Sequence, residues 1–149
     1  MTRLKRRLAA VSGETERGGQ IAADDEAYLA KAAENLACAR SELAAGRYNT
    51  CVSRAYYAAF FAAMAALVRA DVRPIGAWEH AFVASRFSGV LINQRHLYNR
   101  ELSSVLTDLM IARHTADYAT TDVGRKRAER AVPRAERIIR AVIDHGARA

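Results

Sequence analysis

The stretch that decides the fold is RAYYAAFFAAMAALV, residues 54–68. It holds one charge, Arg54, followed by fourteen residues whose most polar groups are two tyrosine hydroxyls. A helix needs about 20 apolar residues to span a membrane, and Arg69 and Asp71 close this run too early. A helix that is apolar on all sides must be buried on all sides. The stretch therefore predicts a core helix and raises the question of what covers it.

Two apolar stripes run along this helix when residues are placed at about 100° intervals. The first stripe holds Val52, Tyr56, Phe60, Ala63 and Leu67, and the second holds Tyr57, Phe61, Met64 and Val68. Two covers for the second stripe are open: a second copy of the chain, or the chain's own helices wrapped around it. We favour a homodimer with the second stripe at its interface, because four neighbours rarely enclose one helix completely in a bundle.

Length and composition limit the class of protein. The chain has 149 residues, of which 51% are hydrophobic and 26% charged, as expected for one globular domain. The start has no signal-peptide core, and Cys38 and Cys51 call for no disulfide, so we expect a cytoplasmic protein with no membrane contact. The net charge of +7 favours an anionic partner such as RNA, DNA or an acidic protein.

The whole chain shows a helical pattern. Only two prolines and eight glycines occur, and no segment alternates as strands do. Residues 1–20 carry a basic cluster and three glycines, which predicts a basic, flexible arm ahead of a helical domain over 21–149. Five helices are expected in that domain, over about 22–45, 49–70, 78–91, 97–118 and 123–145.

Turn and cap signals set the expected boundaries of these helices. Gly46 ends the first helix, and Asn49 or Thr50 caps the second. Thr121 or Asp122 is the expected cap of the fifth helix. Pro133 lies inside that helix and predicts either a kink or the start of a new helix.

The fourth expected helix carries an arginine in an unusual place. Arg113 falls near the middle of the apolar stripe that runs from Leu102 to Ala116, and Asp117 follows it by one turn. A buried guanidinium must be paired or must face a wet cleft. Two alternatives are therefore open: an ion pair between Arg113 and Asp117 within the helix, or a cleft where Arg113 meets a phosphate.

Three segments together carry a resemblance to a known family. YNTCVSRAYYAAFFAAMAALV from Tyr48, HAFVASRF from His80 and RHTADY from Arg113 resemble the HEPN family of small helical prokaryotic proteins. The similarity covers roughly residues 24–145. It implies an all-α, up-and-down bundle of four to five helices that forms a homodimer. Many such proteins are paired with a small nucleotidyltransferase in toxin–antitoxin systems, and many are metal-independent endoribonucleases.

The resemblance also implies site residues. The nuclease members carry an Arg, a polar residue and a closing His, which meet in a dimer cleft. Arg113 matches the Arg and His114 the polar residue, but positions 118–120 read Tyr118, Ala119 and Thr120, so the closing His is absent. The candidate catalytic set is Arg113, His114 and Tyr118, with Asp117 orienting the arginine. A tyrosine, whose unperturbed pKa is about 10, is a poor base at neutral pH.

A second pair of residues fits the same spacing. Arg73 and His80 are separated as the motif requires, but the loop that contains Pro74 and Gly76 lies between them. Because this loop separates the two residues, we interpret the match as chance.

The last expected helix is strongly basic. Arg127, Arg130, Arg134 and Arg137 follow helical spacing on one face. Either they form a solvated face with local acidic partners, or they track the phosphates of a nucleic acid. The four histidines and two cysteines show no metal-ligand spacing, and neither a P-loop nor a nucleophile elbow occurs. We therefore expect no metal and no cofactor.

Two functions from different classes remain open. The first is a HEPN component of a toxin–antitoxin or defence pair that binds RNA or a nucleotide at a dimer cleft, with or without metal-independent endoribonuclease activity. The second is a non-catalytic module that binds or regulates a nucleotidyltransferase or nuclease partner. The missing closing His favours the second.

Overall fold

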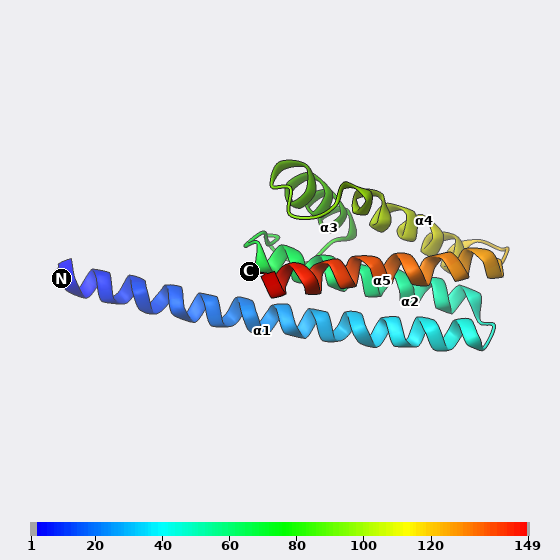
Figure 1. Cartoon of the computed structure of the whole chain (residues 1–149), viewed down its shortest axis with the longest axis horizontal. Helices are drawn as coiled ribbons and strands as arrows, with labels where there is room; N and C mark the ends of the chain where they lie inside the picture. Colours follow the sequence, from blue (N-terminus) through cyan, green and yellow to red (C-terminus); the bar gives the residue numbers. More distant parts are fainter. Residues whose placement is uncertain (1–2, 149) are drawn as a thin grey trace.

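The chain folds as a bundle of helices (Figure 1). The computed structural model describes the backbone of residues 3–148 and the side chains from Gly18 onward, apart from those of residues 21 and 22. No strand occurs in this described part, so the all-α prediction is confirmed. The elements are α1 (Arg3–Ala44), α2 (Tyr48–Arg69), α3 (His80–Arg86), a π-helix η1 (Phe87–Gln94), a 3-10 helix η2 (Arg100–Ser104), α4 (Val105–Tyr118) and α5 (Arg125–Arg148).

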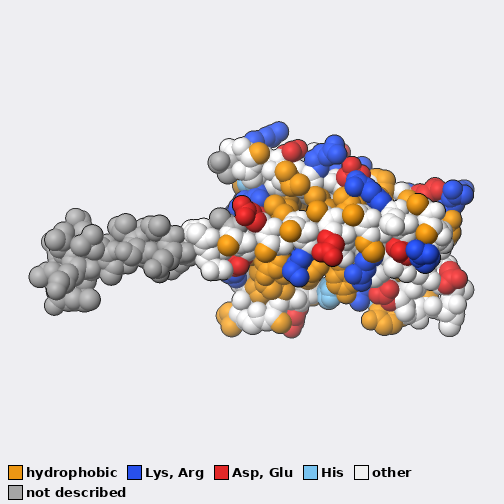
Figure 2. All heavy atoms as spheres, turned by 90° about the horizontal axis from the view of Figure 1, so that it is seen from below, with side chains coloured by type: hydrophobic (Ala, Val, Ile, Leu, Met, Phe, Trp, Pro, Cys, Tyr) orange, Lys and Arg blue, Asp and Glu red, His pale blue; other side chains and the backbone are white. Residues whose placement is uncertain are grey.

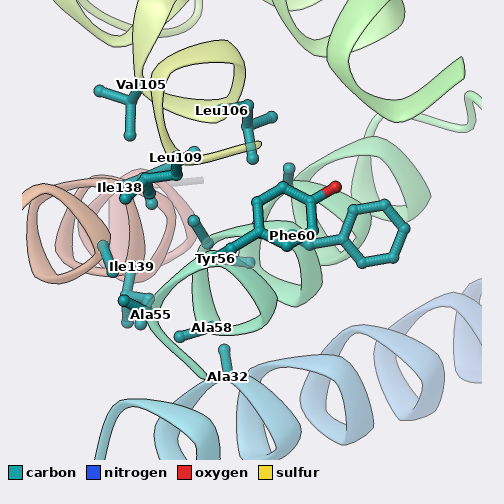
Figure 3. Packing of buried hydrophobic residues seen from close by; sticks show 14 of the residues in the cluster. Ala32, Ala55, Tyr56, Ala58, Phe60, Val105, Leu106, Leu109, Ile138 and Ile139 are labelled. Atoms are coloured by element: carbon teal, nitrogen blue, oxygen red, sulfur yellow. The ribbon is translucent and has the colours of Figure 1, made fainter. Parts of the chain in front are cut away.

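Helix α2 lies at the centre of the bundle. It packs against α1, α4 and α5, and more briefly against α3 and η1. Figure 3 shows Ala58 facing Ala32 of α1, while Leu109 of α4 and Ile138 of α5 close over the other side. The small alanine side chains let the backbones approach closely. The helix is long and apolar enough to cross a membrane. However, 83% of its apolar 18-residue segment is buried inside the fold, as in a core helix.

The chain's own helices cover most of α2. Met64 is 4% exposed and Val68 is fully buried, so the same chain already covers half of the stripe expected at a dimer interface. Tyr57 and Phe61 stay partly exposed. Little of α2 is therefore left for a second copy to cover, and the homodimer stays a prediction.

The first helix begins earlier than expected. Helix α1 starts at Arg3 rather than near residue 22, and its N-terminal part runs beyond the other helices in Figure 1. The three glycines at 13, 18 and 19 do not break it, because a glycine inside a helix costs only about 1 kcal/mol relative to alanine. The flexibility of the arm and the domain boundary near residue 20 stay predictions.

Gly46 ends α1 as expected. Its φ of +77° is left-handed, its N–H donates to the Leu43 carbonyl at 3.1 Å, and the Arg47 N–H donates to Glu42 at 2.9 Å. These two bonds make a Schellman motif. The predicted caps of the next helices were wrong. Helix α2 begins at Tyr48, before Asn49 and Thr50, and the Gly124 carbonyl accepts the first bond of α5.

Asn49 has a different role from capping. Its amide donates to Asp122 Oδ1 at 2.7 Å and its oxygen accepts from the Val123 N–H at 2.9 Å. The two side chains predicted as caps of α2 and α5 thus bond to each other and tie the α4–α5 loop to the start of α2.

Two expected helices are divided. The third is the short α3 followed by the π-helix η1, and the fourth is the 3-10 helix η2 followed by α4. Helix α5, in contrast, continues through Pro133 as one element, so of the two alternatives at Pro133 the start of a new helix is excluded, and the kink stays a prediction. These elements place the C-terminal half of α4 against the N-terminal half of α2, a contact that we call the α2–α4 seam.

Candidate functional site: an arginine on two tyrosine rings

Arg113 lies at the edge of the α2–α4 seam. Its side chain is 17% exposed, so it is neither sealed in the core nor free in solvent. Its Nε donates to Asp117 Oδ2 at 2.9 Å, which is the intrahelical pair expected from the spacing. Burial is the strongest single influence and opposes the charge of Arg113. The hydrogen bond to Asp117 and the charge interactions with Tyr57, Asp117 and Tyr118 together outweigh it, so the pKa of Arg113 lies above its ordinary value.

The guanidinium rests on two aromatic rings. Its Cζ lies 5.5 Å from the ring centre of Tyr56 and 5.3 Å from that of Tyr57. Both distances are within the range of cation–π attraction. We call Tyr56 and Tyr57 the tyrosine platform. Among the described residues, neither terminal nitrogen of Arg113 has a hydrogen-bond partner. Neither belongs to the buried polar atoms that lack a partner, so both nitrogens are accessible to solvent.

His80, which the motif spacing paired with Arg73, joins this group instead. The Tyr56 hydroxyl and His80 Nδ1 form a hydrogen bond, and the His80 ring centre lies 4.8 Å from that of Phe60. Burial and then the charge of Arg113 lower the pKa of His80. Burial raises the pKa of Tyr56 to about 12. At neutral pH the site therefore holds a protonated tyrosine, a neutral histidine and a charged arginine.

The arginine beside His80 is not the one that the spacing indicated. Arg73 pairs elsewhere, with Asp24 at 2.9 Å. The arginine whose charge reaches His80 is Arg113, which is 33 residues away in the chain. The match between Arg73 and His80 was therefore chance as a pair, although His80 itself belongs to the site.

The other predicted residues of α4 form a separate pair. The rings of His114 and Tyr118 lie 5.0 Å apart, and Tyr118 is 67% exposed. They face outward, while Arg113 and Asp117 face α2. The four residues predicted to line one cleft are thus divided between two adjacent sides of α4.

An open groove of about 520 Å³ connects the two sides. It is lined by Asn49, Thr50, Ser53 and Arg54 of α2 and by Ala116, Asp117 and Tyr118 of α4. Arg54 lies over the outer side of the platform, with its Cζ 5.3 Å from the Tyr57 ring. Two arginines therefore contact Tyr57, one from α2 and one from α4.

Most of the predicted basic stripe lines a second hollow. Arg127, Arg130 and Arg134 of α5 border a groove of about 310 Å³ together with Asp108 and Ile111 of α4. Arg137 is exposed on the same helix and does not line it. On the face shown in Figure 2, basic and acidic groups are interspersed, so no single basic patch covers that face. We call this hollow the basic groove.

No metal site is present among the described residues, where no group of three or more His, Cys, Asp or Glu side chains is placed to hold an ion. Cys38 and Cys51 are free thiols, and burial raises the pKa of Cys51 to about 11.

The comparison with protein families agrees with the all-α fold. The family model described as the HEPN domain matches residues 26–145. The chain belongs to the HEPN family. The match spans α1 from Glu26 through most of α5 and includes both helices of the α2–α4 seam and His80. None of the curated proteins matches this HEPN chain.

Proposed function

We propose that this HEPN protein binds single-stranded RNA at the α2–α4 seam, as one member of a cytoplasmic toxin–antitoxin or defence pair. One observation carries the proposal: Arg113 is held on the tyrosine platform by a single bond to Asp117, with its terminal nitrogens open to solvent. An arginine in this state can donate a charge-assisted bidentate pair to a phosphate.

The surroundings of Arg113 favour RNA over a lone phosphate. Tyr118 and His114 present an exposed aromatic pair, with the ring planes tilted by 51°, beside the groove that Arg54 lines. Proteins that bind single strands combine positive charge along the backbone with aromatic side chains on which bases stack. The chain's net charge of +7 adds a general attraction for RNA.

Cleavage of the RNA requires one group to take the 2′-hydroxyl proton and another to protonate the leaving oxygen. The closing His of the nuclease motif is absent, because Tyr118 occupies its place. Binding without a metal ion is the core of the proposal, and metal-independent endoribonuclease activity is its stronger form.

A second function is favoured by the basic groove. Ile111 is 55% exposed at its rim, between Asp108 and the arginines of α5. An exposed apolar side chain ringed by charges suits a protein partner more than RNA. The alternative is therefore a non-catalytic module that binds a nucleotidyltransferase or nuclease partner through this groove.

The test is the affinity for a labelled single-stranded RNA, measured by fluorescence anisotropy in the presence of a chelator. Arg113→Ala should weaken binding by about tenfold or more, because a charge-assisted hydrogen bond contributes about 1.5–3 kcal/mol. Arg140→Ala is the matched control, since it removes the same charge from an arginine that pairs with Glu136.

Arg140→Ala should change the affinity less than about twofold, because rim charges act mainly through long-range attraction. Equal loss of affinity in the two variants would show that net charge alone binds the RNA. Tight binding by Arg113→Ala would refute the proposed site.

A further inference from the structure

His80 and Arg113 come from different helices but share the tyrosine platform. The His80 ring centre lies 5.5 Å from that of Tyr56 and 6.1 Å from that of Tyr57. The Arg113 guanidinium lies over the same two rings. Two groups that can bind anions therefore contact the same two rings, although 33 residues separate them in the chain.

We propose that His80 is a second phosphate-binding residue and that, with Arg113, it forms a two-donor site for one phosphate group on the tyrosine platform. The identity of this phosphate as part of RNA rests on the proposed function. The two-donor site itself rests on the placement of His80, Tyr56 and Arg113.

The hydrogen bond to Tyr56 decides which nitrogen of His80 faces the ligand. Tyr56 is 2% exposed and remains protonated well above neutral pH. A phenol is a better donor than a neutral imidazole, so the Tyr56 hydroxyl donates to Nδ1. In the neutral imidazole the proton then lies on Nε2. Tyr56 thus fixes the tautomer in which Nε2 donates a hydrogen bond.

The Nε2 atom is open to a ligand. Among the described residues, Nε2 has no hydrogen-bond partner. It does not belong to the buried polar atoms that lack a partner, so it is accessible to solvent. The ring packs on Phe60, which holds the imidazole in place. A phosphate oxygen is the acceptor that suits both this N–H and the free nitrogens of Arg113.

The charges around His80 make its protonation a sensor of the bound anion. Tyr56 and Tyr57 of α2 lie beside the ring, the charge of Arg113 of α4 acts on it, and Glu79 next to it in the chain is exposed. Burial and Arg113 disfavour the imidazolium in the free protein. A phosphate adds negative charge, which favours the imidazolium, so the pKa of His80 should rise on binding. By linkage, phosphate affinity should increase as the pH falls through the pKa of His80.

The test is an NMR titration of the four histidine rings in the full chain, with and without inorganic phosphate. The His80 signal is assigned by its disappearance in His80→Gln. The pKa of His80 should rise by about 1 in phosphate, as expected for an opposite charge nearby. The exposed His96, in the loop between η1 and η2, serves as the internal control, and its signal should respond little to phosphate.

Two variants make the outcome decisive. Arg113→Ala should raise the pKa of His80 in the free protein, because a positive neighbour is removed, and should abolish the response to phosphate. Tyr56→Phe keeps the ring but frees Nδ1, and should weaken the response while leaving the fold intact. An unchanged His80 in wild type, or an equal response in Arg113→Ala, would overturn the two-donor site.

A second titration with a short single-stranded RNA separates this inference from the proposed function. If phosphate shifts His80 and RNA does not, the two-donor site stands and the RNA function fails. If Arg113→Ala weakens RNA binding but the His80 signal responds neither to phosphate nor to RNA, the RNA function stands and the role of His80 is refuted.

Discussion

Arg113 combines a structural role with the functional role that we propose for it. Its ion pair with Asp117 and its contacts with two tyrosine rings stabilise the α2–α4 seam. The same contacts leave part of the guanidinium open. The two alternatives that the sequence left open, an internal pair and a wet cleft, are thus compatible, because a guanidinium has five donors and Asp117 uses one.

The stability of the Arg113→Ala variant tests whether the Arg113 side chain is only partly buried, as its 17% exposure indicates. We expect the free energy of unfolding to fall by about 1–2 kcal/mol, because the cation–π contacts and a partly exposed ion pair are removed. Urea unfolding monitored by circular dichroism measures this change. Arg125→Ala is the control, because its pair with Glu129 has the same spacing and the same 2.9 Å distance but is largely exposed.

Arg125→Ala should cost less than about 0.5 kcal/mol, as surface pairs do. A decrease of about 3–5 kcal/mol in Arg113→Ala would instead mean that Asp117 is stranded as a buried charge, and that Arg113 is purely structural.

At the residue scale, the sequence predicted those site residues that helical periodicity makes visible. Arg113 stood out because it falls within an apolar stripe, and Asp117 because it follows by one turn. His80 was missed because its contact with Tyr56 is set by the loop after α2, whose path no periodic pattern describes. The exposed pairing of His114 with Tyr118 was missed for a related reason, since a position about 100° from Arg113 on the wheel is compatible with either side.

At the scale of elements, the pattern located the helices better than their ends. The caps at Asn49 and Asp122 were wrong because these side chains bond to each other across 73 positions of sequence. Side chains that favour caps also favour such tertiary bonds. The π and 3-10 segments between α3 and α4 were also beyond prediction, because their hydrophobic spacing resembles that of an α-helix.

The basic groove belongs to this scale, because its arginines are brought together by successive turns of α5. If the groove binds RNA, changing Arg127, Arg130 and Arg134 to Gln should flatten the dependence of binding on salt. For a single strand, the slope of log affinity against log salt falls by about 0.7 for each phosphate that the protein no longer neutralises. Anisotropy titrations at several salt concentrations therefore give the number of phosphates that the groove binds.

Arg137→Gln is the comparison for this experiment, since Arg137 lies on the same helix but outside the groove. A slope that falls only in the triple variant assigns the groove to RNA. A slope unchanged in both variants returns the basic residues to a solvated face and favours the protein-partner alternative.

At the scale of the whole molecule, the chain wraps its most apolar helix by itself. The number of neighbouring helices alone, without their lengths, predicts that a second copy covers α2. Helix α2 has 22 residues, and α5, with 24 residues, and the C-terminal part of α1 both run along it, so these long neighbours enclose more of α2 than short ones would. Tyr57 and Phe61 remain the part of the predicted interface that a partner copy can still reach.

The whole fold has one consequence for function: it brings α2, α3 and α4 together at the tyrosine platform, away from the basic groove between α4 and α5. RNA that binds at the platform and RNA that binds at the groove would therefore touch different surfaces of α4. The location of bound RNA decides between them.

The most direct measurement is an NMR titration of the isotope-labelled protein with a short single-stranded RNA, following the backbone amides. We predict that the shifts concentrate at Ser53–Tyr57 of α2, at Arg113–Tyr118 of α4 and around His80. Shifts confined to α5, or spread evenly over the basic residues, would contradict an RNA site built on Arg113.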